Sequence, residues 1–207
     1  MLRLDHVVYA VPDLDEAEVR FREEFGLDST EGGRHERWGT ANRILPLGDQ
    51  YLELVTAVDE PMAAETRFGR GVLERAARGG GWFTIAAVAD DLDAVASRLG
   101  LEVGPGSRMR PDGQTVRWRM AGLDDPRRKG WMPFFLIWDI SDELHPGRAR
   151  VGHGVRATGL AWVEVGGDAE RLRTWLGADE LPIRVSDGEP GIHRVAISTA
   201  DGELVIE

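Results

Sequence analysis

The apolar and polar positions of this chain repeat a common pattern in three segments, each starting about 77 residues after the one before. Each segment opens with an apolar run typical of a strand, passes through a turn that contains aspartate, and continues with apolar positions at helical spacing. The opening runs are residues 4–11, 82–88 and 158–165. This order predicts a β-strand followed by an amphipathic helix, three times along the chain.

Capping residues mark both ends of each predicted helix. An aspartate stands where its carboxylate can accept the free N–H groups of the first turn, and a glycine follows the last apolar position, where a left-handed residue ends a helix. The predicted N-caps are Asp13, Asp91 and Asp168, and the predicted stops are Gly26, Gly100 and Gly177.

Strand-like runs separated by turn residues follow each helix and complete a βαβββ unit. They lie at residues 33–38, 41–47 and 50–58, then 101–104, 115–121 and 133–139, and finally 182–185, 191–199 and 203–207. We predict an α+β fold with units at residues 1–58, 82–140 and 157–207. Residues 59–81 are expected to be partly helical and residues 140–156 to form a loop, within one compact body over residues 1–207.

Composition and charge narrow the functional classes. The chain has no cysteine, which excludes disulfides, thiolate metal sites and cysteine nucleophiles. Its net charge of -11 argues against nucleic-acid binding, and no apolar run approaches the roughly 20 residues of a membrane helix. No glycine-rich loop precedes a helix as a phosphate site requires, so we expect no nucleotide cofactor. We expect a cytoplasmic protein that acts on a small molecule, without contact to a membrane.

Several short motifs occur together over residues 2–140. They are LDHVVYAVPDL at 4–14, GGRH at 32–35, GTAN at 39–42, YLEL at 51–54, SR at 107–108, RPDG at 110–113, RW at 117–118 and PFF at 133–135. In this combination the chain resembles the vicinal-oxygen-chelate superfamily, and more narrowly its glyoxalase-like domain branch. The resemblance implies that two units pair their curved sheets into an incomplete barrel around a pocket.

In metal-dependent members of this superfamily the ligands come from the first and last strands of each unit, which corresponds to His6 and Glu53 here. Strand alternation places His6 on one face with Val8 and Ala10. A carboxylate in a strand as apolar as that of Glu53 is costly to bury unless it is paired or bound to metal. A divalent metal at His6 and Glu53 is therefore one hypothesis, with zinc, iron, manganese, nickel and magnesium not distinguished.

The second unit departs from this ligand pattern. Its positions matching His6 and Glu53 are Phe83 or Thr84 and about Phe135, none of which is a strong metal ligand. Missing ligands would have to come from elsewhere, and the candidates are His35, His145, His153 and Glu207. The alternative is a metal-free pocket in which His6 and Glu53 bind each other or polar neighbours.

Residues around this pair supply the rest of the candidate site. His35 and Glu53 are the candidates for moving protons. Asn42 offers a donor and an acceptor to a polar substrate, Arg108 suits an anionic group, and Trp118 offers a flat apolar wall. These three are the predicted substrate-binding residues.

Two functional hypotheses stay open. The first is an enzyme, a lyase, isomerase or dioxygenase whose metal chelates two adjacent substrate oxygens. The second is a metal-free protein that binds or sequesters a small molecule, as resistance proteins and ligand sensors do. Barrels use their units in pairs, whereas three units are predicted here. Either one unit packs differently from the other two, or a second chain completes the assembly as a homodimer.

Overall fold

A computed structural model describes residues 1–207, and its elements follow the predicted order. The first unit consists of β1 (Leu2–Ala10), α1 (Leu14–Phe25), β2 (Thr30–His35), β3 (Thr40–Pro46) and β4 (Tyr51–Ala57). Two helices follow, α2 (Glu60–Glu65) and α3 (Arg67–Ala76). The second unit consists of β5 (Gly81–Ala89), α4 (Leu92–Leu99), β6 (Val103–Met109), β7 (Thr115–Ala121) and β8 (Phe134–Trp138). The C-terminal segment consists of β9 (Ala157–Gly166), α5 (Ala169–Leu176), β10 (Ile183–Ser186), β11 (Gly191–Thr199) and β12 (Gly202–Ile206).

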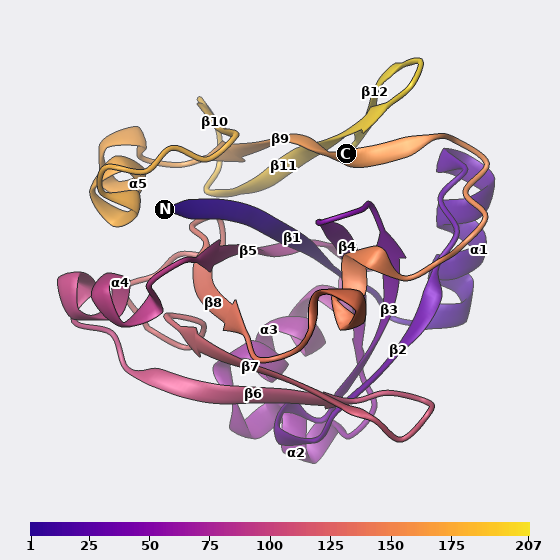
Figure 1. The fold of residues 1–207 in the computed structure, drawn as a ribbon, viewed down its shortest axis with the longest axis horizontal. Coiled ribbons are helices and arrows are strands. Elements are labelled where there is room, and N and C mark those ends of the chain that lie inside the picture. Colours follow the sequence, from indigo (N-terminus) through magenta and orange to yellow (C-terminus); the bar gives the residue numbers. More distant parts are fainter.

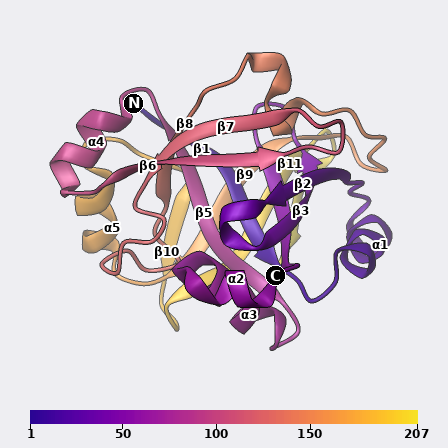
Figure 2. The same ribbon diagram turned by 90° about the horizontal axis from the view of Figure 1, so that it is seen from below.

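The eight strands of the first two units close into a barrel in the order β1-β4-β3-β2-β6-β7-β8-β5 (Figure 1). Half of the wall therefore comes from each unit, and the predicted α+β fold of βαβββ modules around a pocket is confirmed. Figure 2 shows α1 on one side of the barrel and α4 with α5 on the opposite side. None of the helices combines the length and the apolar character of a membrane span.

The predicted helix caps are confirmed. The side chains of Asp13, Asp91 and Asp168 each accept hydrogen bonds from N–H groups of the first turn. Gly26 and Gly100 end their helices in the left-handed conformation, with φ of 67° and 61°. Gly177 also ends its helix, but its ψ of -127° lies outside that conformation.

Two strand predictions were wrong in their boundaries. The strand predicted at residues 33–38 ends at His35, because Glu36–Trp38 forms a 3-10 turn closed by Gly39 at a φ of 60°. The strand predicted at residues 101–104 runs instead over Val103–Met109. Pro105 is tolerated inside it because β6 pairs there with β7 alone, and a proline needs an unpaired edge.

The barrel wall separates two hydrophobic cores, and β1 contributes to both. Val8 packs in the barrel interior, whereas Val7 and Tyr9 pack in an outer core shared with α1, α4, α5 and the C-terminal sheet. This alternation agrees with the predicted faces of the strand. The beginning of the strand differs, because Leu4 packs in the outer core while His6 lines the interior pocket.

A β-bulge at Asp5 causes this change of side. Along the antiparallel ladder with β5, Leu4 pairs with Ala87 and His6 pairs with Ala86, so Asp5 has no partner on that strand. Such a bulge inserts one residue and re-aims the neighbouring side chains. Asp5 and His6 can therefore touch through their side chains, although neighbours on a regular strand point to opposite faces.

The two halves of the barrel meet at two unequal seams. β1 and β5 pair along most of their length, whereas β2 and β6 are joined by a single residue pair, Arg34 with Met109. Gly33 allows the second seam to close, because its φ is 134° and a Cβ there would lie 1.9 Å from the carbonyl oxygen of Met109. The position requires glycine both for its backbone conformation and for the space.

The C-terminal segment has the element order of a βαβββ unit but a different strand pairing. Its sheet runs β10-β9-β11-β12, so β9 pairs in parallel with the strand that directly follows the helix. In the first unit, β1 pairs in parallel with the last strand, β4. The segment covers the outer face of β1 and β5 and completes the outer core (Figure 1). The homodimer expected from a third unit stays a prediction.

Replacing Gly33 with alanine is expected to open the β2–β6 seam for two reasons. The new Cβ would collide with the backbone of Met109, and the alanine would have to adopt a φ that is disfavoured for any residue but glycine. We expect a loss of about 3 kcal/mol in the free energy of unfolding, measured by urea denaturation. Gly152→Ala is the control, because no heavy atom lies within 4 Å of its added Cβ. Equal stability of the two variants would contradict this role of Gly33.

Candidate functional site

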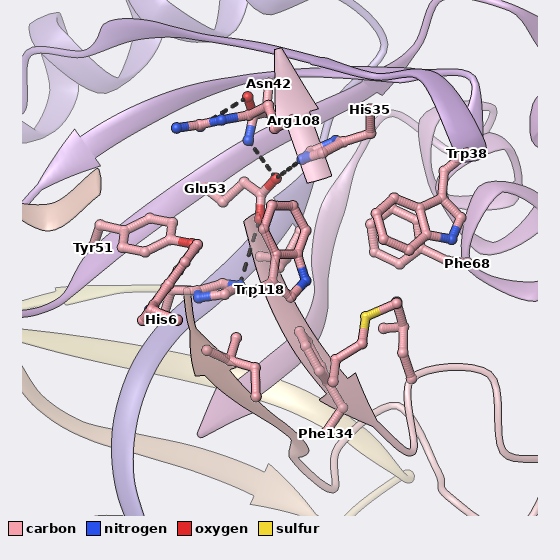
Figure 3. A pocket seen from close by; sticks show the side chains of 15 residues that line it. His6, His35, Trp38, Asn42, Tyr51, Glu53, Phe68, Arg108, Trp118 and Phe134 are labelled. Carbon is pink, nitrogen blue, oxygen red and sulfur yellow. Dashed lines mark hydrogen bonds and ion pairs between the residues drawn. The ribbon is translucent and has the colours of Figure 1, made fainter. Parts of the chain in front are cut away.

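Five polar side chains form a row across the inner wall of the barrel, one from each of five neighbouring strands. The strands β1, β4, β3, β2 and β6 follow one another in the wall, and they contribute His6, Glu53, Asn42, His35 and Arg108 in that order. All five residues are buried, with 3% to 6% of their surface exposed. They line a single pocket (Figure 3).

Glu53 lies at the centre of this row (Figure 3). Asn42 donates a hydrogen bond from Nδ2 to Glu53 Oε1 at 2.7 Å, and Nε2 of His35 lies 3.9 Å from the same oxygen. The other oxygen, Oε2, lies 3.6 Å from Nε2 of His6. Asn42 turns its own oxygen toward Arg108, whose Nη1 donates to Oδ1 at 3.3 Å. Asn42 therefore stands between the carboxyl group of Glu53 and the guanidinium of Arg108.

Backbone positions bring these side chains together. Asn42 and Glu53 are diagonal neighbours on β3 and β4, because Asn42 pairs with Val55. Gly32 on β2 makes room for the next contact, since a Cβ there would lie 2.1 Å from Oδ1 of Asn42 and 2.7 Å from Nη1 of Arg108. A side chain at position 32 would break the Asn42–Arg108 hydrogen bond.

Behind His6, the buried carboxylate of Asp5 accepts hydrogen bonds from three side chains. Nε1 of Trp138 donates to Oδ1 at 3.0 Å, Nε2 of His145 lies 3.2 Å from the same oxygen, and Nδ1 of His6 lies 2.6 Å from Oδ2. Burial alone would raise the pKa of Asp5, but the hydrogen bonds and charges of His145 and His6 outweigh it and hold the pKa below its usual value. Asp5 is therefore ionised at neutral pH.

An ionised Asp5 decides which nitrogen of each histidine carries the proton. Nδ1 of His145 accepts the backbone N–H of Gly147 at 3.1 Å, so the proton of the neutral ring is on Nε2, facing Asp5. When the His6 ring is neutral and donates to Asp5 from Nδ1, its Nε2 is an acceptor. That nitrogen faces Oε2 of Glu53, which receives no hydrogen bond from the protein. Two acceptors thus face each other, and a proton or a ligand donor would bridge them.

His35 lies on the opposite side of Glu53. Its Nδ1 is 3.1 Å from the hydroxyl of Thr40, the residue that it pairs with across the β2–β3 hairpin. Burial lowers the pKa of His35 to about 4; the charge of Glu53 opposes this effect, and the charges of Arg108 and His6 add to it. The ring is therefore neutral at pH 7.

The second unit supplies much of the apolar side of the pocket. The aromatic residues that line it are Trp118, Phe134 and Trp138 from β7 and β8, together with Trp38 and Phe68. Trp118 lies flat against β6 because residue 106 is glycine, where a Cβ would be 2.1 Å from the indole nitrogen. The cavity that these residues enclose has a volume of about 40 Å³, which is smaller than a typical preformed small-molecule site.

All six residues that the sequence proposed for the site line this pocket. They are His6, His35, Asn42, Glu53, Arg108 and Trp118. The further ligand candidates lie outside it. His145 lies behind the site, where it is hydrogen-bonded to Asp5 and its ring contacts those of Tyr51 and Trp138 edge-on. His153 is hydrogen-bonded to backbone groups elsewhere, and Glu207 is exposed and follows β12.

The positions of the second unit that match His6 and Glu53 are Thr84 and Phe134. By register, Val8 pairs with Glu53 in the first unit, and Ala86 pairs with Phe134 in the second. Phe135, which the sequence suggested for this position, packs in the outer core instead, one residue out of phase. The hydroxyl of Thr84 accepts a hydrogen bond from the buried guanidinium of Arg128 at 2.8 Å, so a cation already occupies its oxygen.

The donor set does not fit a resident divalent metal. His6 and His35 approach Glu53 at different oxygens, from opposite sides (Figure 3). Within residues 1–207, no group of three or more His, Cys, Asp or Glu side chains is placed to hold a metal ion, whereas catalytic metals such as zinc use three protein ligands. The matching positions of the second unit are Thr84 and Phe134, so that unit adds no ligand to His6 and Glu53.

Asp5 was not among the predicted site residues, although it is hydrogen-bonded to both His6 and His145. The available signal was a carboxylate inside an apolar strand, the same signal that singled out Glu53. Regular alternation would point Asp5 away from His6, and only the bulge brings them together. Tyr51 was also missed as a site residue; its ring stacks on that of His6 with the centres 4.4 Å apart.

Comparisons with known proteins agree with this fold. The model of a family described as the glyoxalase-like domain matches residues 4–181. No curated protein matches the chain. Among solved structures, a hypothetical protein from Staphylococcus aureus is similar over 100% of this chain and 99% of its own, with a TM-score of 0.73 and 18% identity.

Two methylmalonyl-CoA epimerases of known structure are similar to part of the chain. Methylmalonyl-CoA epimerase from Streptomyces coelicolor, solved with 2-nitronate-propionyl-CoA, covers 65% of this chain and 92% of its own at 24% identity and a TM-score of 0.46. The Mycobacterium tuberculosis epimerase covers 64% and 85% at 24% identity and a TM-score of 0.45.

The buried neutral state of His35 makes stability depend on pH. The unfolded chain protonates His35 near the ordinary histidine pKa of 6.5 and the folded protein only near 4, so the unfolded state binds more protons between these values and stability falls as pH falls. From about pH 7.5 to about pH 5, the loss is expected to be about 2 kcal/mol. Urea unfolding of the wild type and His35→Gln checks this, because the variant should lack that part of the loss. An identical pH dependence in both proteins would mean that His35 is not held neutral.

Proposed function

This chain belongs to the glyoxalase-like domain family, and we propose that its barrel binds a small molecule without a resident metal and exchanges a proton with it through Glu53 and His6. One observation carries the proposal: Oε2 of Glu53 and Nε2 of His6 are 3.6 Å apart, buried, and without a protein donor between them. Groups arranged in this way take a proton from a ligand or share one with it.

Asp5 supports proton transfer through His6. When Nε2 of His6 accepts a proton, the ring becomes a cation, and the ionised Asp5 stabilises that cation at Nδ1 from 2.6 Å. The same contact holds the ring at a fixed angle to Glu53. Asn42 orients Glu53 from the other side through its 2.7 Å hydrogen bond. The pair is thus oriented before any ligand enters, which is what efficient proton transfer requires.

Tyr51 provides a donor beside this pair. Burial raises the pKa of Tyr51 well above its ordinary value, and the nearby charges of Asp5 and Glu53 add to the effect, so the phenol keeps its proton. It lines the pocket together with His6 and Glu53. A neutral phenol can stabilise negative charge that develops on a ligand oxygen. The supported reaction is proton removal and return at a carbon next to a carbonyl, as in isomerisation or elimination.

A protein that only holds its ligand is the second candidate. The aromatic residues opposite the polar row favour it, because flat apolar walls with a few convergent polar groups are the usual form of a binding pocket. The two candidates differ in one measurable property: a binding protein leaves the C–H bonds of its ligand intact.

Solvent exchange in deuterium oxide distinguishes the two. We expect the protein to accelerate the loss of the C–H proton next to the carbonyl in phenylacetone or phenylpyruvate, followed by proton NMR. Glu53→Gln and His6→Gln should each reduce the rate by about 100-fold or more, and EDTA should leave it unchanged. Glu23→Gln, an exposed position on α1, should exchange at the wild-type rate.

Two outcomes would contradict the proposal. Binding of both probes without any exchange would favour the second candidate. Exchange that stops in EDTA and returns with a divalent metal would instead favour a metal at His6 and Glu53.

A further inference from the structure

Arg108 is buried without an anionic side chain in contact with it, and the carboxylate of Glu53 acts on its charge only from beyond Asn42. The residue is only 6% exposed, yet it makes one hydrogen bond, from Nη1 to the neutral amide of Asn42 at 3.3 Å. No carboxyl oxygen of residues 1–207 lies within 4.0 Å of it. A guanidinium has five N–H donors, and burying it without an anionic partner is costly.

Arg128, the other buried arginine of the barrel, has a structural role. Arg128 is 5% exposed and donates to four acceptors, namely Oγ1 of Thr84 and the backbone oxygens of Gly122, Leu123 and Met132. These bonds tie the loop before β8 to β5. Arg108 makes no such set of hydrogen bonds to loops or strands, so the cost of burying it is not offset by a comparable gain in fold stability.

The surroundings of Arg108 keep its donors free. Asn42 occupies the space between Arg108 and Glu53, which prevents the two charges from collapsing into a direct ion pair. Gly32 leaves the room in which this arrangement fits. Arg108 is among the residues that line both the main pocket and a surface groove that also includes Arg110.

We propose that Arg108 binds a carboxylate group of the ligand, so that the substrate class is a small carboxylic acid with a flat apolar body. The inference rests on the proposed function, to which it adds the chemistry of the substrate. A carboxylate matches the planar guanidinium with two parallel hydrogen bonds. Its single negative charge matches the single unpaired cation, whereas a phosphate ester would bring about two into a pocket that also contains Glu53.

The arrangement then gives each part of the ligand a partner. The carboxylate lies on Arg108, a C–H group next to a keto carbonyl of the ligand faces Glu53 and His6 along the polar row, and the apolar body packs against Trp118 and Phe134, which line the same pocket. The spacer Asn42 sets the separation between the anion site and the proton-transferring pair.

Binding of matched ligands tests the charge. Phenylacetate, its neutral amide and phenyl phosphate are titrated into the wild type and followed by tryptophan fluorescence and calorimetry. We expect phenylacetate to bind about tenfold or more tightly than the amide, and more tightly than phenyl phosphate. Arg108→Gln should abolish this preference, Arg108→Lys should retain part of it, and Arg119→Gln, an exposed arginine on β7 paired with Asp93, should keep it in full.

Thermal stability supplies a second test that needs no ligand. If Arg108 serves the ligand and not the fold, Arg108→Gln should unfold at the wild-type temperature or above it. Arg128→Gln should unfold about 5–10 °C lower. A comparable loss in both variants would make Arg108 a structural residue and overturn the inference.

Equal affinity for phenylacetate and its amide, tighter binding of phenyl phosphate, or no phenylacetate binding would each overturn it as well. The proposed function is judged separately by the exchange of phenylacetone, which carries no anion. Exchange of phenylacetone together with equal affinity for acid and amide would leave the proton transfer in place and remove only the carboxylate site.

Discussion

The ionised Asp5 inside the barrel wall is the interaction on which the site depends. A carboxylate that is 2% exposed costs several kcal/mol to bury unless donors surround it. Here the donors come from Trp138 at the end of β8, from His145 in the loop that follows, and from His6 beside it. The bulge of β1, the position of that loop and the orientation of His6 together bring these three donors to the carboxylate of Asp5.

The barrel uses two halves of the same topology for different purposes. The first unit, with Arg108 at the seam, places polar groups on the inner wall, and the second unit places aromatic groups opposite them. Thr84, which matches His6, is bound by Arg128, and Phe134 replaces the carboxyl group of Glu53. The pocket is therefore polar on one side and apolar on the other, which suits a ligand with the same division.

The order of elements and most of the site could be predicted from the sequence because they follow local rules. Caps such as Asp13 and the alternation along β1 depend on near neighbours. The rest depends on contacts between distant segments. Neither the bulge that turns Asp5 toward His6, nor the parallel pairing of β9 with β10, nor the isolation of Arg108 beside Gly32 leaves a local signal. Phe135 was predicted at the position that Phe134 occupies for the same reason, since the register of β8 is set by its pairing with β5.

The proton transfer proposed for His6 requires that Asp5 fix the proton of the neutral ring on Nδ1, so that Nε2 faces Glu53. Nitrogen-15 NMR of the histidine rings measures this directly at neutral pH. We predict that the neutral His6 ring carries its proton on Nδ1 in the wild type and that this preference weakens in Asp5→Asn. A neutral His6 ring with its proton on Nε2 in the wild type would contradict the account.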